Sequence, residues 1–234
     1  MSIVSKILER AVYNQLESFF VKNNILYEYQ SGFRGRYSTD SCLIHLTDHI
    51  RAQTSKGMFT GMIMLDLQKA FDTVDHDIIC RKLLEMGVES VEWFRSYLSD
   101  RTQSVHVNDA KSDFRSVVCG VPQGSILGPL LFLAYINDMS TSISSFCKLI
   151  LYADDSAILF SHKDPSYISQ VLGKELENCS KWLIDNKLSL HLGKTECILF
   201  GSKKKLSKIQ NFTISCNGQE IKSTSTVKYL GSFF

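Results

Sequence analysis

The chain has 234 residues, 44% of them hydrophobic and 21% charged, with a formal net charge of +2. This composition fits one globular domain or two closely packed subdomains, excludes a disordered linker, and permits a nucleic-acid partner without requiring one. No apolar stretch approaches the roughly 20 residues of a membrane helix and no secretion signal opens the sequence, so we expect an intracellular protein, nuclear or cytoplasmic, without a membrane partner.

Helices and a loop precede the first strand. Apolar residues recur three or four positions apart in two segments and predict amphipathic helices, the second capped by Ser38 or Thr39. Glycines and arginines between them predict a loop, and a short apolar run of strand length then ends in Asp66. These elements are the helix 3–21, the loop 31–36, the helix 39–53 and the strand 60–67.

The middle of the chain predicts two short helices, a hairpin and a buried helix. The acids of Asp75 and Asp77 lie in a first helical turn, where they complement the helix dipole. Alternating residues around Asn108-Asp109 indicate a hairpin, and a glycine-bearing turn leads into an apolar helix. The predicted helices are 75–86 and 91–98, the hairpin strands 102–107 and 114–119, the turn 120–125, and the last helix ends near residue 137.

The last part of the chain predicts strands around one long helix. Two apolar runs meet at Ala153-Asp154-Asp155 and indicate a tight hairpin with two acids at its tip, and Asn217-Gly218 indicates another. The ranges are 149–152 and 156–161 for the first hairpin, 167–185 for the helix, and 195–200, 212–216, 220–222 and 227–230 for late strands. Antiparallel hairpins with helices on one face indicate an α+β class.

Three carboxylates stand at the ends of apolar strands. Asp154 and Asp155 would repel each other at a hairpin tip unless a cation neutralises them, and oxygen ligands suit magnesium. Asp66 supplies a third carboxylate if its strand is a neighbour in the same sheet. Local sequence alone leaves another interpretation open, with an exposed turn at Asp154-Asp155 and a helix cap at Asp66, because paired acids are common in turns.

Two further patterns carry no assigned function. The seven cysteines are scattered without a Cys-x-x-Cys pair, which indicates buried reduced thiols rather than disulfides or a zinc site. His45 and His49 lie one helical turn apart but lack the glutamate of a metalloprotease motif, so an exposed helix face explains them.

Three motifs occur in a characteristic order. They are Ala70-Phe71-Asp72 after Asp66, Pro122-Gln123-Gly124 before the buried helix, and Tyr152-Ala153-Asp154-Asp155. In this order they resemble the reverse transcriptase family, and the fuller strings 65–76 and 120–129 look like its non-LTR (LINE-type, jockey-like) retrotransposon branch. The resemblance extends from about Ser5 to Gly231. Several ordered motifs are far more specific than one, so they outweigh the exposed-turn interpretation.

The resemblance implies an RNA-directed DNA polymerase that extends a primer 3′-hydroxyl by a two-metal mechanism and serves retrotransposition. The implied fold is the α+β right-hand polymerase, with fingers over residues 1–59, a palm with primer-grip strands over residues 60–234, and an antiparallel palm sheet backed by helices. The sequence departs from the family pattern at both ends, so we expect shortened fingers and no thumb. The implied partners are an RNA template, a DNA primer and deoxynucleoside triphosphates. The implied cofactor is a pair of Mg²⁺ ions, for which Mn²⁺ can substitute.

The family motifs imply roles for individual residues. Asp66 and Asp154 would hold the metals with Asp155 assisting, and the Leu67 carbonyl would add a ligand. The other implied roles are sugar selection by Phe71, nucleotide binding by Gln123 and Gly124, triphosphate binding by Arg34 or Arg36, protonation of pyrophosphate by Lys194, and primer grip by Tyr229, Leu230 and Gly231. The arginine match is weaker, since Gly35 follows Arg34 at once.

Ordinary structural roles remain as alternatives for most of these residues: a core phenylalanine for Phe71, a helix-start turn for Gln123, a solvated Lys194, and an edge strand at 228–231. At the level of the whole chain, the alternatives are an inactive retroelement remnant that only binds nucleic acid and a host-recruited interaction domain. An intron-maturase relative is disfavoured by the non-LTR character of the motifs.

Overall fold

The computed structural model describes residues 3–234, which form two compact units. Of the described residues, 3–26 and 69–137 form the first unit, and 27–68 and 138–234 form the second. Each unit thus collects two separate stretches of the chain. The division into fingers (1–59) and palm (60–234) follows other boundaries and stays a prediction.

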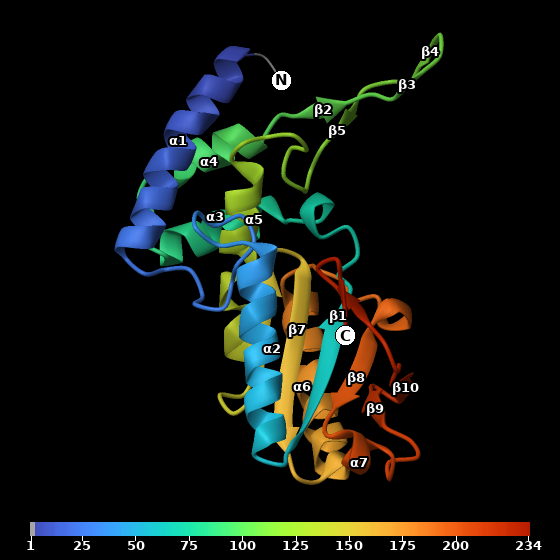
Figure 1. Ribbon diagram of the computed structural model, residues 1–234. Coiled ribbons are helices and arrows are strands. Elements are labelled where there is room, and N and C mark those ends of the chain that lie inside the picture. Colours follow the sequence, from blue (N-terminus) through green and yellow to red (C-terminus); the bar gives the residue numbers. More distant parts are fainter. Residues whose placement is uncertain (1–2) are drawn as a thin grey trace. The chain divides into compact units, whose positions relative to one another are not determined.

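The second unit is built on a four-stranded antiparallel sheet with the order β6-β7-β1-β8. Figure 1 labels β7, β1 and β8, which lie side by side. Residue Phe59 of β1 pairs with His162 of β7, and Leu65 pairs with Ser156. The other side of β1 pairs with β8, and β6 pairs with β7. The strands are β1 (Phe59–Leu65), β6 (Lys148–Tyr152), β7 (Asp155–His162) and β8 (Glu196–Phe200).

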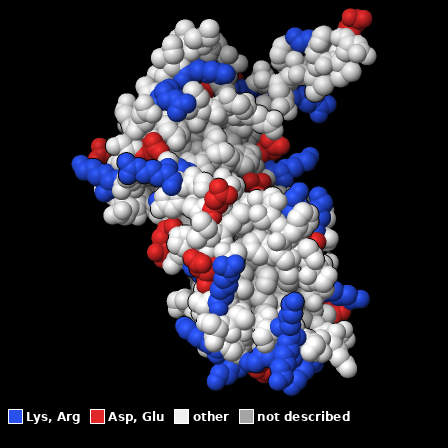
Figure 2. All heavy atoms as spheres, viewed as in Figure 1, with Lys and Arg blue, Asp and Glu red and all other residues white. Residues whose placement is uncertain are grey.

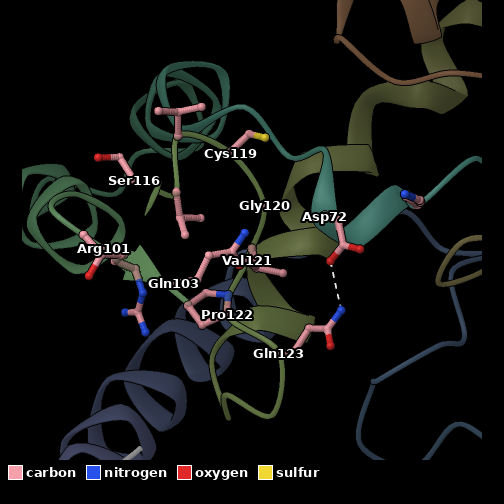
Figure 3. A pocket seen from close by; sticks show the side chains of 13 residues that line it. Asp72, Arg101, Gln103, Ser116, Cys119, Gly120, Val121, Pro122 and Gln123 are labelled. Atoms are coloured by element: carbon pink, nitrogen blue, oxygen red, sulfur yellow. Dashed lines mark hydrogen bonds between the residues drawn. The ribbon is translucent and has the colours of Figure 1, made fainter. Parts of the chain in front are cut away.

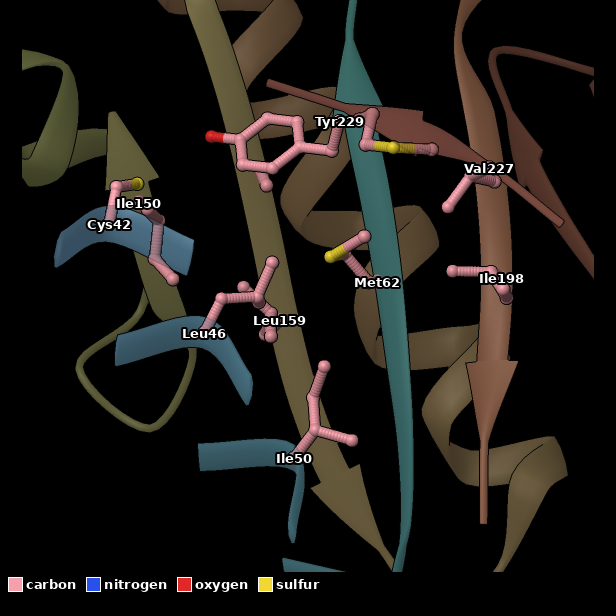
Figure 4. Packing of buried hydrophobic residues seen from close by; sticks show 11 residues of the cluster. Cys42, Leu46, Ile50, Met62, Ile150, Leu159, Ile198, Val227 and Tyr229 are labelled. Atoms are coloured by element: carbon pink, nitrogen blue, oxygen red, sulfur yellow. The ribbon is translucent and has the colours of Figure 1, made fainter. Parts of the chain in front are cut away.

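Helices cover both faces of this sheet. On one face, Met62 and Met64 of β1 join residues of α2 (Thr39–Ser55) in a buried cluster (Figure 4). On the other face, α6 (Pro165–Asp185) lies so close that a Cβ at Gly61 would come within 2.5 Å of Ile168. The prediction of helices on one face is therefore wrong. All seven residues of β1 are buried, and such a continuous apolar run needs cover on both sides.

Smaller elements complete the second unit. A hairpin of two strands packs on α6, and a second short hairpin packs its Tyr229 into the cluster beside α2. Ser38 caps α2 as predicted, with a hydrogen bond from the Ser41 amide. The remaining elements are η2 (Asn137–Ser142, which begins at the last residue of the first unit), η3 (Leu192–Lys194), α7 (Lys203–Leu206), β9 (Thr213–Cys216), β10 (Gln219–Lys222), β11 (Lys228–Tyr229) and β12 (Ser232–Phe233).

The first unit is mainly helical. Its centre is α5, in which eight of nine residues are buried, and α3 packs against it. Asp77 lies in the first turn of α3 as predicted, whereas Asp75 lies just before the helix and caps it by accepting hydrogen bonds from the Asp77 and Ile78 amides. The elements are α1 (Ile3–Lys22), η1 (Ala70–Asp72), α3 (His76–Glu85), α4 (Val91–Leu98), β2 (Thr102–Gln103), β3 (His106–Val107), β4 (Ala110–Lys111), β5 (Arg115–Ser116) and α5 (Gly128–Ile136).

Most predicted elements are confirmed, and further details differ. His45 is exposed as expected, whereas His49 is half-buried, so the prediction of an exposed helix face is wrong for His49. The hairpin around Asn108-Asp109 forms, but it consists of two short ladders of two-residue strands. All of these strand residues are exposed, so their alternating apolar residues do not face a core. Free cysteines are confirmed, yet Cys119 is exposed rather than buried and Cys147 is half-buried. Lys203–Leu206 forms a short helix that was not expected. Within residues 3–234, no helix is long and apolar enough to cross a membrane.

Candidate active site

Asp66 and Asp155 are placed side by side by the register of the sheet. Leu65 pairs with Ser156, so the next position brings Asp66 of the β1 end opposite Asp155, the first residue of β7. Side chains of directly opposed residues project to the same face, with Cβ atoms about 5 Å apart. This is the face of Met62 and Met64, so both carboxylates lie at the end of the α2-covered face.

Asp154 lies in the two-residue turn between β6 and β7. Tyr152 pairs with Asp155, which leaves only Ala153 and Asp154 in the turn, and Ala153 adopts a left-handed backbone with φ of 55°. The predicted tip with both acids is therefore corrected: Asp155 belongs to the strand and only Asp154 to the turn. A left-handed residue that is not glycine costs free energy, so its surroundings must hold the turn.

The loop before α2 holds this turn. Gln30 is 1% exposed, and its Oε1 accepts hydrogen bonds from the amides of Gly32 (2.8 Å) and Ala153 (3.0 Å). The Ser31 amide donates to the Leu151 carbonyl, and the Leu151 amide donates to the Tyr29 carbonyl. The segment 29–32 is thereby fixed to the strand and the turn that precede Asp154 and Asp155.

Gly32 allows this close approach. A Cβ at this position would lie 2.9 Å from the Tyr152 carbonyl carbon and closer still to the Ala153 nitrogen. Both neighbours are backbone atoms, which cannot rotate away as a side chain would. Glycine is therefore required by packing against the turn that carries Asp154.

The three carboxylates influence one another. The pKa of Asp155 is raised. Partial burial of its carboxylate is the largest cause, and the negative charges of Asp154 and Asp66 add to it. The residue as a whole remains exposed to solvent. Within residues 3–234, no three His, Cys, Asp or Glu side chains are already gathered as metal ligands. A divalent cation would relieve the repulsion among these carboxylates. Because the carboxylates offer only oxygen atoms as ligands, Mg²⁺ suits them.

Two other segments adjoin the acidic end. The His191 amide donates to the Asp66 carbonyl (2.8 Å), so η3 follows directly beside Asp66, and its Lys194 is exposed. Tyr229 is 4% exposed, and its hydroxyl donates to the Asp155 carbonyl (3.4 Å). Burial raises the pKa of Tyr229 well above its usual value. The turn Leu230-Gly231 is thereby attached to the strand of Asp155.

The loop arginines differ in their surroundings. One guanidinium nitrogen of Arg34 donates to the carbonyls of Tyr27 (3.0 Å) and Gln30 (2.9 Å), and its guanidinium lies over the Tyr37 ring. Arg36 is exposed and has a left-handed backbone with φ of 70°. Arg34 therefore stabilises the loop, whereas Arg36 is presented to solvent.

In the first unit, η1 and the turn before α5 are joined. The Gln123 side-chain amide donates to the Asp72 carboxylate (3.0 Å), as Figure 3 shows. The partly exposed ring of Phe71 stacks on Phe132 of α5 with centroids 4.2 Å apart. Gly124 is exposed, and nothing lies within 4 Å of a Cβ built on it. Phe71, Gln123 and Gly124 are thus parts of one local structure.

This local structure borders a cavity of about 630 Å³ in the first unit (Figure 3). Asp72, Gln123, Lys69 and Arg101 line it with polar groups. At its edge, Gly120 has φ of 85°, and a Cβ there would lie 2.7 Å from the Asp72 carbonyl oxygen. A second position thus requires glycine to keep η1 and the turn together.

A buried glutamate of α1 holds the start of α5. Glu9 is 2% exposed, and its Oε2 accepts hydrogen bonds from the amides of Ile126 (2.7 Å) and Leu127 (3.5 Å). Among residues 3–234, its Oε1 and the Tyr97 hydroxyl are buried without a close hydrogen-bond partner. The pKa of Tyr97 is raised to about 12, mainly by burial. Of its neighbours, Ser125 lowers this pKa and the charge of Glu9 raises it.

Removal of Glu9 is expected to destabilise the first unit. In Glu9→Ala the buried amides of Ile126 and Leu127 lose their acceptor, which should cost about 2 to 3 kcal/mol. Glu9→Gln keeps a carbonyl oxygen and removes a buried negative charge, so its cost should be smaller. Urea unfolding of both variants measures this difference, and equal destabilisation would contradict the capping role.

Sequence patterns did not reveal Gln30, Glu9 or Asp72 as parts of these structures. Gln30 and Glu9 each bond a residue more than 100 positions away, and no local pattern signals such a partner. Asp72 stands in the motif that contains Phe71, and its bond to Gln123 joins two of the motifs.

Comparisons with known proteins agree with these motifs. A family model described as "Reverse transcriptase (RNA-dependent DNA polymerase)" matches residues 1–234. A probable RNA-directed DNA polymerase from transposon BS of Drosophila melanogaster is 32% identical over 99% of this chain and 26% of the relative. The RNA-directed DNA polymerase from mobile element jockey of the same species is 28% identical over 97% of this chain and 25% of the relative. The chain spans about a quarter of these relatives.

Among solved structures, two yeast telomerases have a similar fold. Telomerase from Candida tropicalis, in complex with a fragment of telomeric RNA, has a TM-score of 0.63 and 15% identity, and covers 86% of this chain and 34% of that one. Telomerase from Candida albicans, in a similar complex, has a TM-score of 0.61 and 14% identity, over 94% and 37% of the two chains. At this identity the likeness concerns the fold alone.

Proposed function

The chain belongs to the reverse transcriptase family, and we propose that it is the polymerase part of a non-LTR retrotransposon protein, which adds deoxynucleotides to a DNA primer on an RNA template. The observation that carries the proposal is the register that sets Asp66 opposite Asp155, beside the turn of Asp154. The sheet with these acids would be the palm, and residues 1–59 would contribute fingers.

The carboxylates would form the reaction centre. Asp66 and Asp154 would hold two Mg²⁺ ions, or Mn²⁺ in their place, with Asp155 assisting and the Leu67 carbonyl as a further ligand. Bound metal ions supply Lewis acidity, which makes the primer 3′-hydroxyl a better nucleophile and neutralises charge on the triphosphate. Lys194, exposed in η3 beside Asp66, would donate a proton to the leaving pyrophosphate.

Other residues would bind the nucleotide and the primer. Gln123 and Gly124 would line the nucleotide pocket, with Asp72 fixing the Gln123 amide. Of the two arginines, Arg36 is the better placed to meet the triphosphate, because the Arg34 guanidinium already bonds its own loop. For the primer grip, Leu230 and Gly231 would touch the primer end while the buried Tyr229 anchors their turn.

Primer extension on an RNA template tests the proposal directly. We expect extension of a DNA primer with deoxynucleotides and Mg²⁺, loss of extension on chelation, and recovery when Mg²⁺ or Mn²⁺ is restored. Nucleic-acid binding without extension under any of these conditions would favour the alternative, an inactive remnant that only binds nucleic acid.

Phe71→Val is expected to weaken sugar selection. Its partly exposed ring, stacked on Phe132, would stand under the sugar of the nucleotide, so a smaller side chain leaves room for a 2′-hydroxyl. The efficiency of ribonucleotide relative to deoxynucleotide incorporation should rise at least about 10-fold, since steric exclusion of one small group is worth about 1 to 3 kcal/mol. Steady-state incorporation kinetics measure it, and unchanged discrimination in an active variant would remove Phe71 from this role.

A further inference from the structure

Lysines gather at the end of the sheet opposite the three carboxylates. At this end β1 begins, and β7 and β8 finish beside it, as the pairs Phe59–His162 and Thr60–Phe200 show. Figure 2 shows Lys and Arg side chains concentrated where Figure 1 places α7. The lysines that follow these strand ends, or precede β1, are Lys56, Lys163, Lys203, Lys204, Lys205 and Lys208, which we call the lysine end.

The lysine end is far more positive than the rest of the protein. The three chain segments that carry these lysines contain one carboxylate, that of Asp164. Its Oδ1 accepts a hydrogen bond from the Ser166 amide and caps α6. Six of the 26 basic residues and one of the 24 acids lie here, so 20 basic residues and 23 acids remain elsewhere, a net charge of −3. A net charge of +2 for the whole chain therefore conceals a strong local asymmetry.

A packed structure holds the segments that carry these lysines. Lys205 donates to the Gly57 carbonyl and lies over the Phe59 ring, which fixes α7 to the start of β1. A Cβ at Gly201 would lie 2.8 Å from that ring, so the chain leading into α7 is tightly packed. The other five lysines are exposed, and in the described residues 3–234 none of them has a carboxylate within ion-pair distance.

A polar groove opens beside these lysines. It has a volume of about 720 Å³ and lies between the first turn of α6 and residues 208–213. Lys208, Ser166, Gln170, Gln210 and Asn211 line it with one ammonium and several neutral hydrogen-bonding groups, and Asp164, the cap of α6, adds one carboxylate. The α6 N-terminus adds a positive dipole end, and the ring of Tyr167, 45% exposed, lies in the first turn of the same helix.

We propose that the lysine end and its groove bind the sugar-phosphate backbone of a single-stranded nucleic acid, as a second contact surface away from the polymerase site. Unpaired ammonium groups neutralise phosphates, while hydroxyl and amide side chains bond sugar and phosphate oxygens without reading sequence. The exposed ring of Tyr167 in the first turn of α6 packs on His162 and offers a surface for base stacking. This surface goes beyond the proposed function and does not depend on catalysis.

A nucleic acid explains the surface better than an anionic membrane does. Proteins that insert into a membrane surface expose large aliphatic or aromatic side chains among their basic residues. In the part of the chain that the structure describes, the exposed Ile, Leu and Val side chains belong to other segments, and Tyr167 is the large exposed aromatic residue at this surface. The groove adds polar hydrogen-bonding groups that a headgroup layer does not need.

A very short nucleic acid bound at the three carboxylates would not reach the lysine end. Seven residues of β1 separate the two ends of the sheet, a distance of about 20 Å. Stacked nucleic acid rises about 3.4 Å per nucleotide, so about six nucleotides would be needed to bridge this distance. A template strand extending from the acidic site, or a separate strand, satisfies this requirement.

A binding experiment without polymerisation tests the proposal. The variant carries Lys163→Gln, Lys203→Gln, Lys204→Gln and Lys208→Gln, and keeps Lys205 because it anchors α7. Its control carries Lys22→Gln, Lys174→Gln, Lys181→Gln and Lys222→Gln, four exposed lysines elsewhere, with the same loss of charge. Fluorescence anisotropy with labelled 30-nucleotide RNA and DNA single strands, without Mg²⁺ or nucleotides, gives the dissociation constants at several salt concentrations.

We expect the lysine-end variant to bind both strands at least about 10-fold more weakly at 0.1 M salt. The slope of the logarithm of its binding constant against the logarithm of the salt concentration should become shallower by about 2 to 3. The control should change neither by a comparable amount, and both variants should melt like the unmodified chain. Equal weakening in the control, an unchanged salt dependence, or tighter binding to phosphatidylserine vesicles than to either strand would overturn the proposal. Failure of primer extension alone would leave this result standing and contradict only the proposed function.

Discussion

Asp154→Asn is expected to lower RNA-templated primer extension at least about 1,000-fold while the chain stays folded. Asparagine keeps the size of aspartate and removes the charge that would hold the metal ions. The melting temperature should be unchanged or slightly higher. Burial is the main reason for the raised pKa of Asp155, and the charges of Asp154 and Asp66 raise it further, so removing the Asp154 charge relieves part of the opposition to its ionisation in the folded state. Measurement combines extension rates at saturating Mg²⁺ with thermal unfolding.

Two matched variants make this result specific. Asp164→Asn removes a carboxylate from the opposite end of the same sheet, where it caps α6, and should leave the extension rate within about 3-fold with little change in stability, because Asn caps a helix about as well as Asp. Asp155→Asn should reduce extension less than Asp154→Asn does, since Asp155 is assigned an assisting role. A normal extension rate for Asp154→Asn would remove the carboxylates from the reaction and leave only the nucleic-acid-binding alternative.

The sequence was informative about this site where strand ends and turns have local signals. The apolar run before Asp66 and the two runs around Ala153 predicted the strands that carry the acids. Their pairing in one sheet was a condition of the metal-site prediction, and the register of β1 with β7 satisfies it. Helix boundaries were also predictable, because Ser38 and Asp75 are capping residues directly before apolar periodic segments.

Features that depend on distant contacts had no such signal. The burial of both faces of β1 required the position of α6, more than 100 residues later in the chain. Gln30 and Glu9 resemble ordinary polar residues in sequence, and only the fold shows that they accept backbone hydrogen bonds at the turn of Asp154 and the start of α5. The gathering of three separate lysine segments at one sheet end likewise follows from strand register rather than from composition.

Gly32→Ala is expected to reduce primer extension at least about 100-fold, because the new methyl group would displace the turn that carries Asp154. The added Cβ would meet the backbone of Tyr152 and Ala153, so the loop or the turn must shift. That shift would also stretch the bonds from the Gly32 and Ala153 amides to Gln30. Misplacing a catalytic group by about 1 Å can cost about 100-fold in rate, and overpacking costs about 1 to 3 kcal/mol.

A second glycine separates lost activity from lost stability. Gly218 has φ of 78° in the turn between β9 and β10, and nothing lies within 4 Å of a Cβ built on it. Gly218→Ala should therefore cost about 1 kcal/mol through backbone strain while extension stays within about 3-fold. Unfolding free energies and extension rates of both variants are compared below their melting temperatures. If Gly32→Ala loses stability but extends primers as well as Gly218→Ala does, the loop does not position the turn of Asp154.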